Sequence, residues 1–138
     1  MYFVVPGEPK GKGRPRFGKG RTYTPEETVR YEALVRECFG EQCGYEMPFA
    51  EETPVIVNIW AAYGIPESYS KKKAAAARER KIFPTKKPDC DNIIKIICDA
   101  LNGLAYVDDR QIVSVSCRKV YADEPYVGVY INEKLEDE

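Results

Sequence analysis

The sequence predicts a single domain of the α/β or α+β class, for three reasons. The chain has 138 residues, which is enough for one core of ordinary size and too few for two. Strand-like runs of β-branched and aromatic residues, the clearest at 55–63, are interspersed with segments of helical spacing, the clearest at 93–104. Apolar residues form 43% of the chain, so there is material for a core and no signature of disorder. We therefore expect residues 1–138 to fold as one unit.

The composition also excludes several classes of protein. No apolar run approaches the roughly 20 residues that a membrane helix needs, and the N-terminus lacks the pattern of a secretory signal. We expect a cytoplasmic protein without a membrane partner. The five cysteines are odd in number and form no C-x-x-C pair, which argues against a disulfide framework. Histidine is absent, so any chemistry must use carboxylates, lysine or a hard metal ion.

The net charge of −1 conceals a segregation of charge along the chain. Residues 1–30 hold seven Lys/Arg and three acids, and residues 71–87 hold eight Lys/Arg and one acid. This pattern is typical either of a split binding surface for a polyanion or of two solvated charge runs, and we weigh the two about equally. The candidate phosphate contacts are Lys10, Lys12, Arg14, Arg16, Lys19, Arg21, Lys71, Lys72, Lys73, Lys86 and Lys87.

The first part of the chain predicts a strand, a basic loop and a helix. Tyr2–Val5 is the strand, and the loop at 10–21 interleaves glycines with Lys and Arg. The loop could approach phosphates, with Phe17 stacking on a base, or form a flexible hairpin tip. For the helix we expect Thr24 at the N-cap, Pro25 at the first position and Glu27 completing a capping box, with the end before Gly40.

The middle of the chain predicts a central strand and a short basic helix. Residues 55–63 are rich in β-branched and aromatic side chains and stop at a Gly-Ile-Pro sequence. Ser70 opens the alanine-rich segment 71–81, and the prolines that follow prevent the helix from continuing.

The most secure helix follows, because the apolar residues between 93 and 104 recur with the spacing of one buried face. We expect Asn102-Gly103 to stop it, and then a strand at Gln111–Tyr121, its hairpin partner at Tyr126–Ile131, and a frayed acidic tail at 133–138. The opposite face of the helix should carry Asp91, Lys95, Cys98, Asp99 and Asn102.

Two pairs of aspartates flank this helix, Asp89 with Asp91 before it and Asp108 with Asp109 after it. Its two ends lie about 18 Å apart, so the pairs can meet only if residues 104–107 run back along it. A cluster formed in this way would need a divalent cation to neutralise it. Each aspartate also has a quieter explanation, as a helix cap, a turn residue or part of a surface ladder of ion pairs.

The segment KKPDCDNIIKIICDALNGLAYVDDRQIV resembles the core motif of the RusA-type Holliday junction resolvases. The shared features are D-x-D-N followed by a lysine, D-A-L, and D-D-x-Q before a β-branched residue. GKGRPRF and the TYTP helix start resemble the phage and Gram-positive branch of that family. The likeness extends from Gly11 to Val113, with Cys90 where a leucine is usual.

The resemblance implies a mixed β-sheet with helices packed on it, and a metal-dependent endonuclease that cuts four-way DNA junctions by paired cuts as a homodimer. Mg²⁺ would be the cofactor, with Mn²⁺ as a substitute. Carried over by position, the catalytic residues are Asp89, Asp91, Asp109 and Lys95, and Asp108 is a further candidate metal ligand. Two alternatives stay open: a nuclease for other branched DNA such as flaps or forks, and a DNA-binding module without catalysis.

Overall fold

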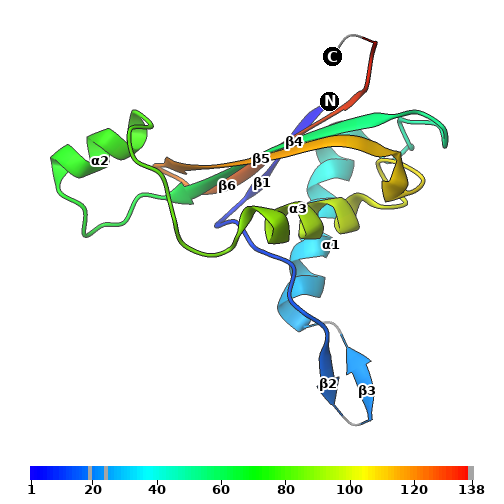
Figure 1. Cartoon of the computed structure of the whole chain (residues 1–138), viewed down its shortest axis with the longest axis horizontal. Coiled ribbons are helices and arrows are strands. Elements are labelled where there is room, and N and C mark those ends of the chain that lie inside the picture. Colours follow the sequence, from blue (N-terminus) through cyan, green and yellow to red (C-terminus); the bar gives the residue numbers. More distant parts are fainter. Residues whose placement is uncertain (19, 24, 137–138) are drawn as a thin grey trace.

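Four strands form a mixed sheet in the order β1-β6-β4-β5 (Figure 1). The computed structural model describes residues 1–18, 20–23 and 25–136, and for Arg16 and residues 21–23 it describes the backbone alone. The strands span Tyr2–Pro6 (β1), Val55–Gly64 (β4), Ile112–Ala122 (β5) and Tyr126–Glu133 (β6). β4 pairs in parallel with β5 and antiparallel with β6, which in turn pairs antiparallel with β1. The predicted mixed sheet and the predicted central strand are both confirmed.

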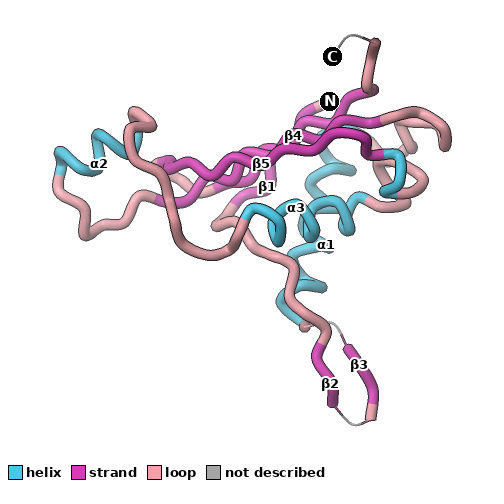
Figure 2. Tube along the Cα trace, viewed as in Figure 1, coloured by secondary structure: helices cyan, strands magenta, loops and turns pink. Residues whose placement is uncertain are grey.

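Two helices cover one face of this sheet, α1 (Glu26–Cys43) and α3 (Cys90–Leu101) (Figure 2). Alternate residues of β4 from Val55 to Tyr63 point to them and are buried. The α3 face of Ile93, Ile96, Ile97 and Leu101 packs there with no exposed area. α1 packs on β1, where the rings of Phe3 and Phe39 meet edge to face at 5.4 Å.

Each of the two basic parts of the sequence places one small element at an extremity of the molecule, whereas Lys10 of the first part and Lys86 and Lys87 of the second line one pocket near the start of α3. α2 (Lys71–Arg78) lies beyond one end of the sheet, and β2 (Arg16–Gly18) and β3 (Arg21–Tyr23) form a small hairpin that extends away from the body (Figure 1). The predicted start of α2 is confirmed, because the Ser70 hydroxyl accepts a hydrogen bond from the Lys73 N–H at 3.1 Å. The predicted stop of α3 is also confirmed, with Gly103 at φ +79°.

The predicted hairpin between the last two strands is wrong, because β4 lies between β5 and β6. The turn after Ala122 crosses the end of β4 at Gly64 before β6 begins. Gly64 lies at this crossing: its N–H donates to the Glu8 carboxylate at 3.1 Å, and a Cβ there would lie in ordinary contact with Pro125, at 3.6 Å. Hydrophobic pattern alone identifies strands, and it does not say which strand a short turn bypasses.

The ends of α1 also differ from expectation. The helix continues three residues past Gly40. Gly40 is buried because the Tyr45 ring packs against it, and a Cβ added at Gly40 would lie only 2.0 Å from that ring. Glycine here makes room for a close contact and does not end the helix. At the start, Pro25 precedes the first helical residue, and the expected cap Thr24 lies outside the described residues.

Three smaller expectations also fail or fall outside the structure. Leu104 lies beyond the end of α3, and Cys98, expected on its exposed face, is buried against the segment that follows the helix. Glu133 belongs to β6 and pairs with Val55, so the acidic tail begins later than expected, and its last two residues are not described.

Among the described residues, no helix combines the length and the apolar content that crossing a bilayer requires.

Candidate active site

The start of α3 is anchored from both neighbouring strands of the sheet. The hydroxyl of the buried Tyr63 on β4 donates to the Pro88 carbonyl at 2.9 Å, and the Cys90 thiol donates to the Cys117 carbonyl on β5 at 3.7 Å. Asp89 is the N-cap residue, but its side chain makes no capping hydrogen bond. Asp89 and Asp91 are therefore exposed carboxylates at a rigidly held helix N-terminus, where the helix dipole favours negative charge.

The glycines of the basic segment let its backbone pack against this helix. The Lys12 N–H donates to the Asn92 carbonyl at 2.9 Å, and a Cβ on Gly11 would lie 2.8 Å from Pro88. Gly13 donates to the hydroxyl of the buried Thr28 at 3.1 Å, and a Cβ there would clash with the same oxygen. These two glycines thus fix the segment to α3 and α1, a role that the sequence analysis did not foresee.

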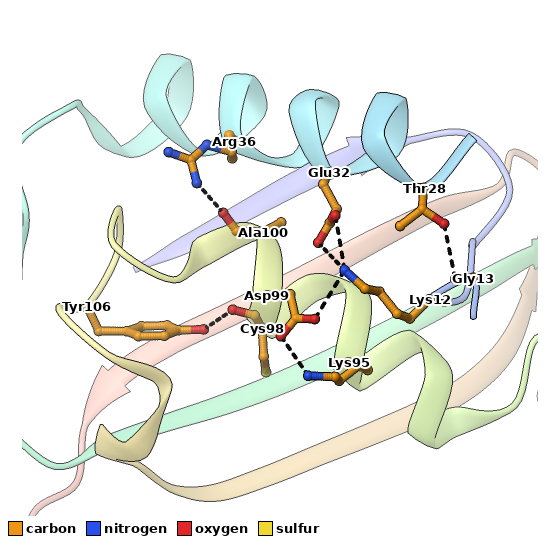
Figure 3. A network of polar contacts seen from close by, with 10 residues as sticks. All are labelled: Lys12, Gly13, Thr28, Glu32, Arg36, Lys95, Cys98, Asp99, Ala100 and Tyr106. Carbon is orange, nitrogen blue, oxygen red and sulfur yellow. Dashed lines mark hydrogen bonds and ion pairs between the residues drawn. The ribbon is translucent and has the colours of Figure 1, made fainter. Parts of the chain in front are cut away.

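A chain of charges continues from this contact into α3 (Figure 3). The Lys12 ammonium lies 3.1 Å from Glu32 on α1 and 3.2 Å from Asp99 on α3, and the other Asp99 oxygen accepts from Lys95 at 3.0 Å. Lys12 and Asp99 side chains are each only 22% exposed, whereas Lys95 is 61% exposed. Lys12 and Asp99 thus form the largely buried part of the network, and the Lys95 ammonium forms its exposed end.

Electrostatics keep Lys12 charged in this setting. Burial alone would lower its pKa, but the hydrogen bonds and charges of Glu32 and Asp99 outweigh burial and raise the pKa above 10.5. A lysine that compensates two carboxylates in this way is committed to the fold, and it is poorly placed to contact a phosphate as well.

The other end of α3 uses its aspartates differently. Asp108 caps the short 3-10 turn Asp109–Gln111: its carboxylate accepts from the Arg110 N–H at 3.0 Å, and the Gln111 side chain accepts from the Asp108 N–H. The Arg110 N–H bond is the main reason that the pKa of Asp108 is lowered. Gln111 is buried and also donates to the carbonyls of Ala50 and Thr53. The D-D-x-Q motif thus has a structural function at its first and last positions.

Asp109 returns along α3 only as far as its last turns. Its N–H donates to the Asn102 side chain at 3.0 Å, and the Tyr106 hydroxyl just before it donates to the Cys98 carbonyl at 2.7 Å. Burial raises the pKa of the Cys98 thiol to about 11, with a smaller contribution from the charge of Asp109. The described residues contain no group of three or more Cys, Asp or Glu side chains that could hold a metal ion. The chain by itself therefore does not gather the four aspartates into one cluster.

The remaining candidate contacts for DNA are mostly exposed. Arg14 lies on the open rim of a pocket between the basic segment and α1, next to Lys10, which pairs with Glu27 at 3.3 Å. Lys71, Lys72, Lys73, Lys86 and Lys87 are exposed on α2 and on the linker to α3. The side chains of Arg16, Lys19 and Arg21 lie outside the part that the structure describes.

The family model for the endodeoxyribonuclease RusA matches residues 6–132. This chain belongs to the RusA family. An uncharacterised Bacillus subtilis (strain 168) protein, YqaN, is 37% identical over 140 residues, which cover 96% of each chain. Family membership implies an enzyme of the endodeoxyribonuclease class, and the match includes α3 and both pairs of aspartates.

Proposed function

We propose that this protein is a Mg²⁺-dependent, structure-selective endonuclease that resolves four-way DNA junctions by paired cuts. The observation that carries the proposal is the start of α3, where Asp89 and Asp91 present carboxylates without a capping bond and Lys95 follows one turn later on the same helix. A site of this kind on a firmly anchored helix suits the precise positioning that phosphoryl transfer requires.

The donor chemistry fits Mg²⁺, although residues 1–18, 20–23 and 25–136, which the structure describes, offer no three-carboxylate cage. Mg²⁺ prefers oxygen ligands and is commonly held by one or two carboxylates together with water and substrate phosphates. Asp89 and Asp91 would supply those carboxylates, with Asp109 as the third candidate and Asp108 as a neighbour already occupied by its cap. When bound, the metal would polarise the scissile phosphate and lower the pKa of a water.

The protein's own residues have separate tasks in this proposal. Lys95 would lie beside the non-bridging phosphate oxygens and offset the charge that develops on them. The interaction would be preorganised, because Asp99 holds the Lys95 ammonium and is itself fixed by Lys12. Arg14, in the segment that leads to β2, and the α2 lysines would bind phosphates further along the arms of the junction, since the β2–β3 hairpin and α2 lie at separate extremities of the molecule (Figure 1).

Two copies of the chain would act together. A four-way junction has approximate two-fold symmetry, and its resolution needs a cut in each of two opposing strands, so a C2 homodimer suits the substrate. Native mass spectrometry at micromolar concentration, with and without a junction, should report a dimer. A mass that remains monomeric under both conditions would count against paired cutting.

The decisive experiment compares a labelled four-way junction with flap, fork and linear duplex substrates of matched sequence, each with Mg²⁺, with Mn²⁺ and with EDTA. We expect metal-dependent cutting of the junction in preference to the linear duplex. Stronger cutting of flaps or forks would assign the same residues to the related nuclease. DNA binding with no metal-dependent cutting of any substrate would reject the enzyme and leave the non-catalytic binding module.

A further inference from the structure

The face of the sheet opposite α1 and α3 carries an aromatic and cationic surface that the proposed function does not use. α1 and α3 lie on the other side, and α2 lies beyond one end (Figure 1). Outward-facing side chains gather in a hollow of about 200 Å³ over β1, β4 and β6. These side chains form an aromatic platform, which consists of Tyr2, Trp60, Tyr126 and Tyr130 together with Arg80 and Arg118.

The platform presents flat rings and guanidinium groups close together. Arg118 is the cross-strand neighbour of Trp60, and its guanidinium lies 5.3 Å from the indole centroid, while that of Arg80 lies at 5.0 Å. The rings of Tyr2 and Tyr130 are 4.3 Å apart, and their residues are 43% and 42% exposed. Large aromatic side chains left this exposed on a sheet are typical of a binding surface.

Arg80 of the platform has a backbone conformation that favours glycine. After α2 the Arg80 N–H donates to Ala77 and the Lys81 N–H to Ala76, a pattern in which the residue at Arg80's position is left-handed and usually glycine. Arg80 has φ +60°, which is unfavourable for a residue with a Cβ. The fold would be better served by glycine, so the arginine is explained by what its guanidinium does over Trp60.

Charge decides between the two kinds of macromolecule that could cover this surface. The outward positions of the four strands include no Asp or Glu, and within the described part of the chain neither Arg80 nor Arg118 forms an ion pair. A second copy packed face to face would bring arginines against arginines with no carboxylate between them. A single-stranded nucleic acid offers phosphates for the arginines and unpaired bases for the rings.

We propose that the aromatic platform binds single-stranded DNA, with bases stacked on Trp60 and the tyrosines and phosphates paired with Arg80 and Arg118. This activity goes beyond junction cleavage and uses none of the proposed catalytic residues. Duplex DNA should bind poorly there, because its bases are already stacked on one another.

Trp60 is the only tryptophan in the chain, so its fluorescence reports on the platform alone. Titration with an oligothymidylate in EDTA, which prevents metal-dependent cutting, should quench the emission to saturation, with an affinity that falls as salt rises. A linear duplex of equal length should need at least about tenfold more DNA. Equal quenching by the duplex, or none by the single strand, would overturn the proposal, whatever the cleavage assay shows.

Three variants separate binding from folding. Arg118→Gln should weaken the single-strand titration several-fold, and Arg30→Gln, which removes an arginine from the exposed side of α1, should not change it. Arg80→Gly should weaken binding while the melting temperature stays the same or rises, because glycine relieves the positive φ. A platform that serves a second copy would instead give a Trp60 emission shift that depends on protein concentration without DNA, and Arg118→Gln would leave the DNA titration unchanged. Either result would overturn the proposal.

Discussion

The two ends of α3 carry the same number of flanking aspartates and use them in different ways. At the N-terminal end, Asp89 and Asp91 leave their carboxylates exposed, while the backbone around them is held by Tyr63 and by the basic segment. At the C-terminal end, the carboxylate of Asp108 caps the 3-10 turn by accepting a hydrogen bond from the Arg110 N–H. A residue with no structural bond for its side chain is the better candidate for chemistry, and the sequence does not distinguish the two cases.

The largest expected effect tests the N-terminal end. Asp91→Asn and Lys95→Ala should each lower the rate of junction cleavage by about 10² or more, since the first removes a proposed metal-binding carboxylate and the second removes the cation proposed to offset charge on the reacting phosphate. Binding, measured by gel shift in Ca²⁺, whose looser coordination supports binding without efficient cutting, should change little. A variant that cleaves at the wild-type rate would remove its residue from the proposed site.

A second prediction concerns the basic segment that docks on this end. Arg14→Ala combined with Arg16→Ala should flatten the dependence of log Kobs on log salt by up to about 2 units, if each side chain neutralises one phosphate. Junction binding measured by anisotropy between 50 and 200 mM salt checks this. An unchanged slope would leave the two arginines as solubility residues.

The sequence predicted the local elements around the two ends of α3, but not the long-range contacts that distinguish the two ends. The helix, its stop at Gly103 and the central strand follow from local periodicity, and local periodicity is what hydrophobic patterns report. The ion pair of Lys12 with Asp99 joins residues far apart in sequence, and the bypass of β4 by the last turn depends on tertiary packing. Asp108 and Asp109 look equivalent in the sequence, and only the hydrogen bonds around Gln111 separate them.

A third, smaller effect tests the network that supports Lys95. Lys12→Met leaves Glu32 and Asp99 without their shared cation and should lower the free energy of unfolding by about 2 kcal/mol, since these side chains are largely buried. Lys10→Met is the matched control, because the Lys10–Glu27 pair is exposed and should contribute less than about 0.5 kcal/mol. Urea unfolding at pH 7 measures both, and equal losses would contradict the network's role.

The same pair of variants should respond differently to alkali. The pKa of Lys12 is raised in the folded state, so its contribution is complete below pH 10.5 and is lost as the pH rises through the folded-state value. The stability gap between wild type and Lys12→Met should therefore be constant from pH 7 to 10 and close above it. A gap that is already closing near neutral pH would assign it to another group.

The smallest effects separate the two adjacent aspartates at the C-terminal end of α3. Asp108→Asn keeps an oxygen that can accept from the Arg110 N–H, but it removes the negative charge that pairs with the Arg110 guanidinium at 3.2 Å, and it should lower the melting temperature slightly. Asp109 is held through its own N–H, which Asp109→Asn keeps. Because the pKa of Asp108 is lowered in the fold, its contribution is present above pH 3.8 and is lost as the pH falls through the folded-state value, so the difference from wild type should vanish in acid. Cleavage should show the opposite order, with Asp109→Asn impaired and Asp108→Asn active. If Asp108→Asn abolishes cleavage without a change in melting temperature, the carboxylate of Asp108 acts in the chemistry, and the contrast between the two ends of α3 fails.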